Sequence, residues 1–174
     1  MTKLKATGWC LIIGMCVVLS IFACGKEDDP EAKLTVLLKD APGDFQQVNI
    51  EVVEVRVHSS AEGWVTVPVN DSIYDLLLLS DSANAVLGLT ALSASNISQI
   101  RLIIGAQNTV MVDSVIHPLA MSSQDESGLK LNVNQTLASG GVYTLTIDFD
   151  ANASVTLQGN GVYRLKPVLS AEFQ

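Results

Sequence analysis

Residues 142–149 read Val-Tyr-Thr-Leu-Thr-Ile-Asp-Phe, a run in which large apolar side chains alternate with polar ones. Successive side chains of a β-strand point to opposite faces. The run therefore predicts a strand with one face in a core and one face toward solvent. The core face would consist of Tyr143, Leu145, Ile147 and Phe149.

The longest candidate strand runs from Val48 to His58, and its apolar residues change phase within it. Val48, Ile50 and Val52 alternate in one phase, and the valines at 53, 55 and 57 continue one step out of phase. A change of phase inside a strand predicts a β-bulge near Val52-Val53, which would let both halves bury their valines.

Other segments repeat this kind of pattern between turns rich in Gly, Pro, Asn, Asp and Ser. Further strands are predicted at 34–39, 64–69, 97–104, 109–112, 115–119, 129–137, 155–157 and 163–173. Residues 105–108 predict a hairpin turn between two of them. Residues 73–79 fit either a buried strand or a helical turn, and residues 85–92 could hold one short helix.

Roughly nine to eleven short strands, with no competing helical period, predict an all-β sandwich or barrel. We expect a single antiparallel β-sandwich, immunoglobulin-like or prealbumin-like, over residues 33–174 of the 174-residue chain. All three cysteines, Cys10, Cys16 and Cys24, lie before this region, so the domain would rely on its core rather than on disulfides.

The first 23 residues have the features of a secretory signal peptide. Lys3 and Lys5 precede an apolar run of 14 residues, 10–23, which is shorter than the about 20 residues that a membrane-spanning helix needs. The alternatives are an ordinary signal peptide without lipid and an uncleaved anchor helix.

The end of this segment, Ile-Phe-Ala-Cys at 21–24, resembles a bacterial lipobox. Phe22 departs from the pattern, because a small residue is usual at its position. Cleavage behind Ala23 would leave Cys24 as the new N-terminus, carrying a diacylglycerol thioether and acyl chains such as palmitate. Several acyl chains together anchor a protein durably, since each buried CH₂ contributes about 0.8 kcal/mol.

Residues 24–32 form an acidic tether, which resembles the export signal of Bacteroidetes surface lipoproteins and predicts display on the outer face of the outer membrane. A plain solvated linker, with the domain on the periplasmic face, is the alternative. The chain from Cys24 carries 8 of the 10 Lys and Arg and all 18 Asp and Glu, a net charge of −10. This charge argues against nucleic acid and other polyanions as partners.

Several further stretches resemble a bacterial and archaeal lipoprotein family that is known only as domain of unknown function 4382. They lie in order along the chain at 34–44, 48–50, 99–105, 108–110, 127–132, 145–151 and 161–169. The turn at 93–96 departs from the family, which usually has a Pro-Ala-Gly-like turn there. The resemblance implies a β-sandwich on a lipid anchor and implies no activity.

Metal-binding and catalytic patterns are weak in this sequence. His58 and His117 are isolated, and no cofactor is expected. Calcium could use the aspartates at 40, 44, 148 and 150, although Asp40 and Asp44 suit a turn equally well. No nucleophile elbow, triad context, phosphate loop or distinguishable carboxylate pair points to an enzyme.

Aromatic and modification sites remain as candidates. Trp64 and Tyr74 border predicted loops and could stack on a sugar, although a core or rim role is the alternative for both. Ser72, Ser82 and Ser114 each follow Asp and precede Ile, Ala or Val, a pattern like the acceptor of Bacteroidetes O-glycosylation.

Together these observations predict a lipid-anchored, non-catalytic module of the cell envelope that binds a ligand or a partner. Glycan is the expected ligand class, by analogy with other β-sandwiches. The first alternative is a structural or adhesive component of a surface fibre or envelope assembly. An accessory envelope hydrolase is the second alternative.

Overall fold

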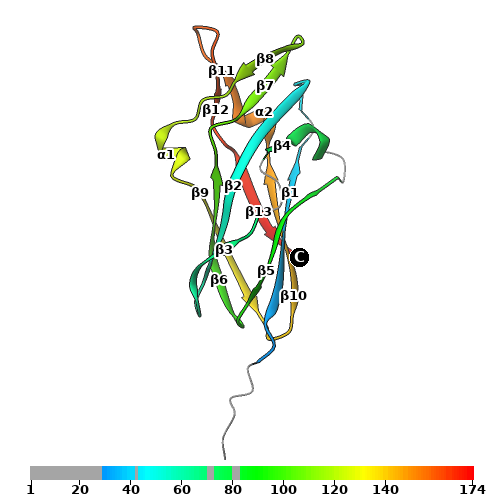
Figure 1. Cartoon of the computed structure of the whole chain (residues 1–174), viewed down its shortest axis with the longest axis vertical. Helices are drawn as coiled ribbons and strands as arrows, with labels where there is room; N and C mark the ends of the chain where they lie inside the picture. The colour runs from blue at the N-terminus through cyan, green and yellow to red at the C-terminus, as the bar shows by residue number, and fades with distance from the viewer. Residues whose placement is uncertain (1–28, 42, 70–72, 80–82) are drawn as a thin grey trace, which may run out of the picture.

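The computed structural model describes residues 29–41, 43–69, 73–79 and 83–174, and it is a two-layer β-sandwich (Figure 1). One layer is a four-stranded sheet of order β13-β10-β1-β5. Its strands are β1 (Ala32–Asp40), β5 (Ala85–Leu92), β10 (Val142–Phe149) and β13 (Leu169–Phe173). The all-β sandwich expected from the sequence is confirmed.

The second layer is a seven-stranded sheet in which β2 pairs with four neighbours. Its strands are β2 (Gln47–Ser59), β3 (Gly63–Val67), β4 (Ile73–Asp75), β6 (Ser95–Ile104), β7 (Thr109–Val112), β8 (Val115–Pro118) and β9 (Leu129–Leu137). A separate hairpin of β11 (Val155–Leu157) and β12 (Tyr163–Leu165) brings the strands of the described residues to thirteen. The number exceeds the nine to eleven expected because residues 163–173 form two strands, β12 and β13, and because residues 85–92 form β5.

The bulge predicted in β2 is confirmed. The register of β2 against β6 shifts between Val52 and Glu54. Val52 and Val55 are buried on either side of it, whereas Val53 is the extra residue and is 55% exposed. The bulge therefore keeps Val52, Val55 and Val57 in the core and turns Arg56 and His58 toward the outside. The expectation that Val53 is buried as well is wrong.

The hairpin predicted at 105–108 is wrong. β6 and β7 do not pair with each other; both pair with β2, along Val52–Ser59 and Gln47–Asn49 respectively. The backbone N–H of Gly105 donates to the carbonyl of Glu51 at 2.8 Å where the chain passes from one strand to the next. A strand of 13 residues is long enough to hold two shorter ones end to end.

Residues 85–92, which are ambiguous in sequence and could hold one short helix, form strand β5 instead. β5 pairs antiparallel with β1 and supplies hydrogen-bond partners to its backbone, so tertiary pairing overrides a weak local helix preference. For residues 73–79 the sequence allowed a strand or a helical turn, and the structure has both: strand β4 is followed by a 3₁₀ helix at Leu76–Leu79. β1 and β10 pair in parallel, which a purely antiparallel prediction does not include.

The core lies between the two sheets and is entirely aliphatic and aromatic at its centre. The largest fully buried side chains are Phe149, Leu34, Leu38, Ile50, Leu76, Leu87, Leu92, Ile97, Ile100, Leu102, Leu137 and Leu145. β3 lies beside β5 at one side of the sandwich, and β9 lies beside β13 at the other. Both layers therefore contribute alternate residues of their strands, as β-sandwich packing requires.

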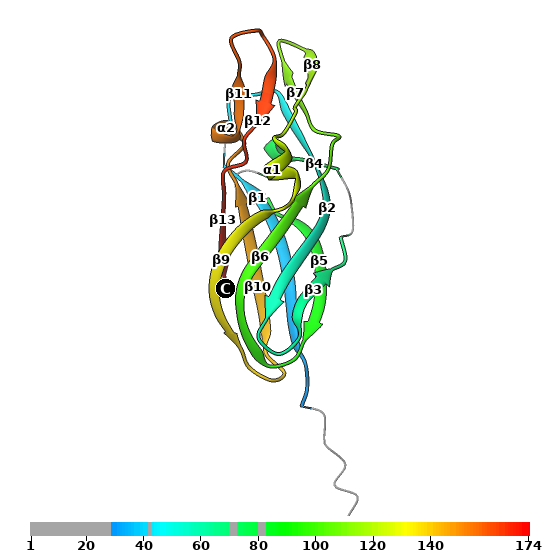
Figure 2. The same ribbon diagram turned by 90° about the vertical axis from the view of Figure 1, so that its left-hand side faces the viewer.

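The chain enters the sandwich at the start of β1, at the end opposite to the β7–β8 and β11–β12 hairpins (Figures 1 and 2). Two short helices, α1 (Ser123–Glu126) and α2 (Ala151–Ser154), lie toward that far end. Within the described residues, no helix is both long and apolar enough to cross a membrane.

Candidate functional site

The outward side chains of β3, β2, β6 and β9 form two adjacent rows across the seven-stranded sheet. The first row is Trp64, His58, Gln99 and Asn132. The second row is Thr66, Arg56, Arg101 and Lys130. We call these eight residues the tryptophan face. Inward neighbours such as Val55, Val57 and Ile100 are fully buried, so the face is one polar surface laid over the core.

Trp64 is the aromatic centre of this face. The turn before it is held by the Ser59 hydroxyl, which accepts from the N–H groups of Ala61 and Glu62, and it ends at Gly63 with a φ of 75°. This turn sets Trp64 directly opposite His58. The two rings meet edge to face with centroids 5.0 Å apart, and 39% of Trp64 remains exposed.

Arg101 reaches across β2 to the same indole. Its guanidinium carbon lies 4.5 Å from the Trp64 ring centroid, a cation–π contact. The indole is thus held by an imidazole at its edge and a guanidinium against its ring. The guanidinium covers part of the ring, and the exposed 39% of Trp64 is the surface on which a sugar could pack.

Three cations occupy directly opposed positions in the second row, on β2, β6 and β9. Arg56 forms an ion pair with Glu54 at 2.6 Å, and the Glu54 carboxylate also accepts from the Thr66 hydroxyl at 2.7 Å. The hydrogen bond from Arg56, followed by that from Thr66, lowers the pKa of Glu54. Among the side chains that the structure describes, Arg101 and Lys130 form no ion pair.

Side-chain amides and one hydroxyl complete the surroundings of the face. Gln99 donates to the Asn132 carbonyl oxygen at 3.0 Å, and Asn96 donates to that of Asn134 at 3.0 Å. His58 Nδ1 lies 2.9 Å from the Ser98 hydroxyl. Amides and hydroxyls beside an aromatic ring can exchange hydrogen bonds with the hydroxyls of a sugar.

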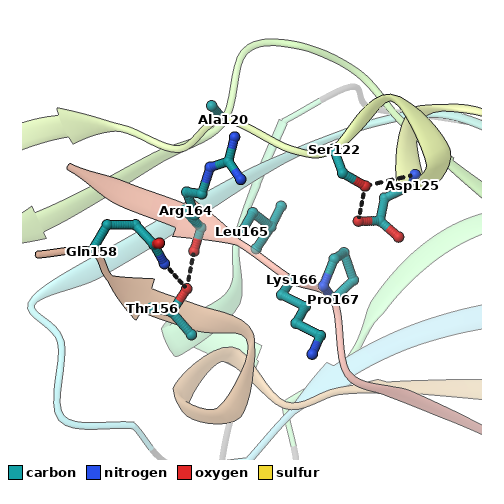
Figure 3. A pocket seen from close by; sticks show the side chains of 9 residues that line it. All are labelled: Ala120, Ser122, Asp125, Thr156, Gln158, Arg164, Leu165, Lys166 and Pro167. Carbon is teal, nitrogen blue, oxygen red and sulfur yellow. Dashed lines mark hydrogen bonds between the residues drawn. The ribbon is translucent and has the colours of Figure 1, made fainter.

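A pocket of about 430 Å³ lies at the far end of the molecule, between α1, β11 and β12 (Figure 3). Ser122 donates to Asp125 at 2.6 Å on one wall, and Thr156 donates to the backbone carbonyl of Arg164 on the other. Figure 3 shows the Arg164 and Lys166 side chains extending in opposite directions, so their charges do not converge on one point. None of the described residues that line this pocket is aromatic, which makes it a weaker candidate than the tryptophan face.

The aspartates considered for calcium each have a structural partner instead. Asp40 Oδ1 accepts from the N–H of Ala151 at 2.8 Å, and Asp150 caps α2 by accepting from the N–H of Ala153 at 2.8 Å. Asp148 pairs with Lys39 at 2.9 Å, and Asp44 lies near Asn152. Among the described residues, no three His, Cys, Asp or Glu side chains are grouped as a metal site would need.

Of the aromatic candidates, only Trp64 is available at a surface. Tyr74 is 7% exposed and packs in the core, which is the alternative role that the sequence allowed. The structure places Ser114, an acceptor-like serine, in the exposed two-residue turn between β7 and β8. Cys24, Ser72 and Ser82 lie outside the described residues.

The cations and amides of the tryptophan face were not singled out by the sequence. Strand alternation shows that Gln99 and Arg101 point away from the buried face of 97–104. What it does not show is their register, and only the pairing of β6 with β2 and β9 brings them beside Trp64 and Lys130.

Comparisons with known proteins give a family and no close relative. No curated protein and no solved structure matches the chain. Residues 31–167 match the family described as "Domain of unknown function (DUF4382)", a match that covers most of the sandwich. The chain therefore belongs to the DUF4382 family.

Proposed function

We propose that this protein is a non-catalytic, lipid-anchored module of the bacterial cell envelope and that its tryptophan face binds glycan. One observation carries the binding proposal. Trp64 is a partly exposed ring held between His58 and Arg101 on an open, polar sheet face. The neighbouring amides of Gln99 and Asn132 are suited to hydrogen bonding with sugar hydroxyls.

Binding is tested on a glycan array with the protein purified from membranes in detergent. We expect wild type to bind a subset of the glycans and Trp64→Ala to lose at least tenfold in affinity, about 1.4 kcal/mol, because the indole supplies the apolar surface on which the sugar would pack. Leu89→Ala is the matched control, since Leu89 is 60% exposed on β5 of the opposite sheet. Absence of binding to any glycan, or equal loss in both variants, would contradict the proposal.

The proposed anchor rests on residues 1–32 of the sequence alone: the basic start, the short apolar run, Cys24 and the acidic tether. We propose lipidation of Cys24 and display on the outer face of the outer membrane, as in Bacteroidetes surface lipoproteins. Protease added to intact cells should digest the wild-type domain, and Cys24→Ala should release the protein from the membrane fraction. Protection until the outer membrane is broken would place the domain in the periplasm instead.

A structural or adhesive role is the second candidate, and the far end of the sandwich favours it. The β7–β8 and β11–β12 hairpins carry four exposed aliphatic side chains, Val115, Ile116, Leu157 and Val162. The His117 and Tyr163 rings, 4.9 Å apart, join the two hairpins. Cross-linking on whole cells would identify a protein captured at this end, and Ile116→Asp should abolish that capture without affecting glycan binding.

An accessory hydrolase is the third candidate. Ser98 and His58 are within hydrogen-bonding distance, but they lie on an open sheet face, and the ring facing His58 is Trp64 rather than a carboxylate. A serine nucleophile usually needs a base that is oriented by a third group. We expect no turnover of ester or glycoside substrates; turnover that Ser98→Ala abolishes would favour the hydrolase.

A further inference from the structure

We infer that the tryptophan face selects acidic glycans, with Arg101 and Lys130 binding a carboxylate or sulfate of the sugar that stacks on Trp64. This inference rests on the proposed glycan binding and adds the chemical class of the ligand. It requires that the positive side chains of the tryptophan face outnumber the carboxylates that form ion pairs with them.

The second row of the face meets this requirement. Arg56, Arg101 and Lys130 stand directly opposite one another on adjacent strands, an arrangement that costs stability because like charges repel. Glu54 neutralises Arg56 through the ion pair at 2.6 Å. The charges of Arg101 and Lys130 have no such partner among the described side chains, so the face carries a surplus of two positive charges.

Arg101 links this surplus to the aromatic platform. Its guanidinium lies over the Trp64 ring, so an acid group on a sugar that packs on the exposed part of the ring would lie close to it. The Nε–H of Arg101 and that of Arg56 are buried without a hydrogen-bond partner among the described side chains. These two N–H groups are shielded from solvent, so the terminal NH₂ groups of Arg101, which form no ion pair among the described side chains, are the donors that a carboxylate or sulfate could use.

The overall charge of the chain limits the ligand to a modest size. The net charge of −10 from Cys24 onward repels polyanions at long range, as the sequence alone indicates. At physiological salt this repulsion is screened beyond about 8 Å. A short acidic glycan at the tryptophan face therefore interacts mainly with the nearby positive charges of Arg101 and Lys130. A short or sparsely charged acidic glycan thus fits better than a dense polyanion such as nucleic acid.

The test compares each of a set of uronic-acid and sulfated oligosaccharides with its carboxyl-reduced or desulfated form, using the detergent-purified full chain and calorimetry. We expect about tenfold tighter binding to the acidic form, since hydrogen bonds to charged groups are the stronger ones. Lys130→Gln should lower this preference and leave binding to the neutral form within about twofold. Arg101→Gln should lower the preference and also weaken binding to the neutral form, because Arg101 holds the Trp64 ring. Lys33→Gln makes the same charge change on the exposed outer side of β1, in the opposite sheet, and should leave the preference unchanged.

The outcomes separate this inference from the proposed function. Equal binding to acidic and neutral forms would overturn the acidic preference and leave glycan binding in place. Binding to neither form would overturn both. An equal effect of Lys33→Gln and Lys130→Gln would also overturn the inference, because the preference would then follow net charge rather than the face.

Discussion

The guanidinium carbon of Arg101 lies 4.5 Å from the centre of the Trp64 ring, although the two residues are carried by strands that do not pair with each other. β2 lies between their strands, and its bulge turns Arg56 and His58 outward into the same face. The contact therefore depends on the register of three strands. It links the packing of the sheet to the site where we propose that glycan binds.

The bulge buries Val52 and exposes its neighbour Val53, so truncating these two valines should have different effects on stability. Val52→Ala should lower the free energy of unfolding by about 1.5–3 kcal/mol, because Val52 is 1% exposed and truncation leaves a cavity. Val53→Ala should change it by no more than about 0.5 kcal/mol, because Val53 is 55% exposed. Urea denaturation of both variants checks this, and equal losses would contradict the assigned bulge.

Gly88 in β5 allows the two sheets to approach at the β3 side. A Cβ at this position would collide with the backbone carbonyl oxygen of Pro68, which cannot move aside as a side chain can. We expect Gly88→Ala to lower the free energy of unfolding by about 1–3 kcal/mol. Gly159→Ala, where a Cβ meets no atom within 4 Å, is the control and should cost little. Similar melting temperatures for the two variants would show that β5 is not packed in this way.

Asp40 should make the protein less stable as the pH rises from about 4 to about 6. Burial raises the pKa of this carboxyl to about 6, despite the hydrogen bond from Ala151, so the folded protein holds a proton that the unfolded chain releases near pH 4. Stability contributed by the neutral form is then lost as the pH rises through this window, by up to about 3 kcal/mol. Above about pH 7, one unit beyond this pKa, the loss is complete and this contribution stays constant.

Asp40→Asn removes this titration and should flatten the stability profile between pH 4 and pH 6 relative to wild type. The exposed Asp44 gives the matched control, and Asp44→Asn should keep the wild-type slope. Urea denaturation at pH 4, 5, 6 and 7 measures all three proteins. Parallel profiles for wild type and Asp40→Asn would refute the assignment of the slope to Asp40.

Ser114 is the one acceptor-like serine whose surroundings the structure describes. Asp113 and Ser114 have φ values of 48° and 61°, as a type I′ hairpin turn requires, and the serine is exposed. If it carries an O-linked glycan, Ser114→Ala should lower the intact mass of native protein by that glycan. Ser123→Ala, at another exposed serine not preceded by aspartate, should change the mass only by the lost oxygen. A native mass explained by lipid and polypeptide alone would exclude the modification.

Local patterns predicted the strands and the bulge well, because alternation is a property of a few consecutive residues. They failed where the structure of a segment depends on pairing with a strand that is distant in the sequence. Residues 85–92 have little local preference for a strand, and it is pairing with β1 that makes them one. β1 pairs in parallel with β10, and the paired residues, such as Lys39 and Asp148, are 109 positions apart in the sequence. This pairing has no local signal.

In the candidate site, too, local sequence identifies some residues, whereas others are recognised only from the pairing of the strands. Trp64 could be named from sequence because an aromatic residue beside a loop is a recognisable feature. Arg101 and Lys130 could not, since their approach to Trp64 follows from cross-strand register. Tyr74, equally near a loop, packs in the core instead.

Tryptophan fluorescence tests the central claim most directly. The chain has two tryptophans, Trp9 and Trp64, and only Trp64 remains in a protein that begins at Cys24. Titration with a glycan that scores on the array should change the Trp64 emission in a saturable way and protect it from acrylamide quenching. Binding of that glycan with unchanged emission and unchanged quenching would show that it binds elsewhere, and would contradict the tryptophan face as the binding site.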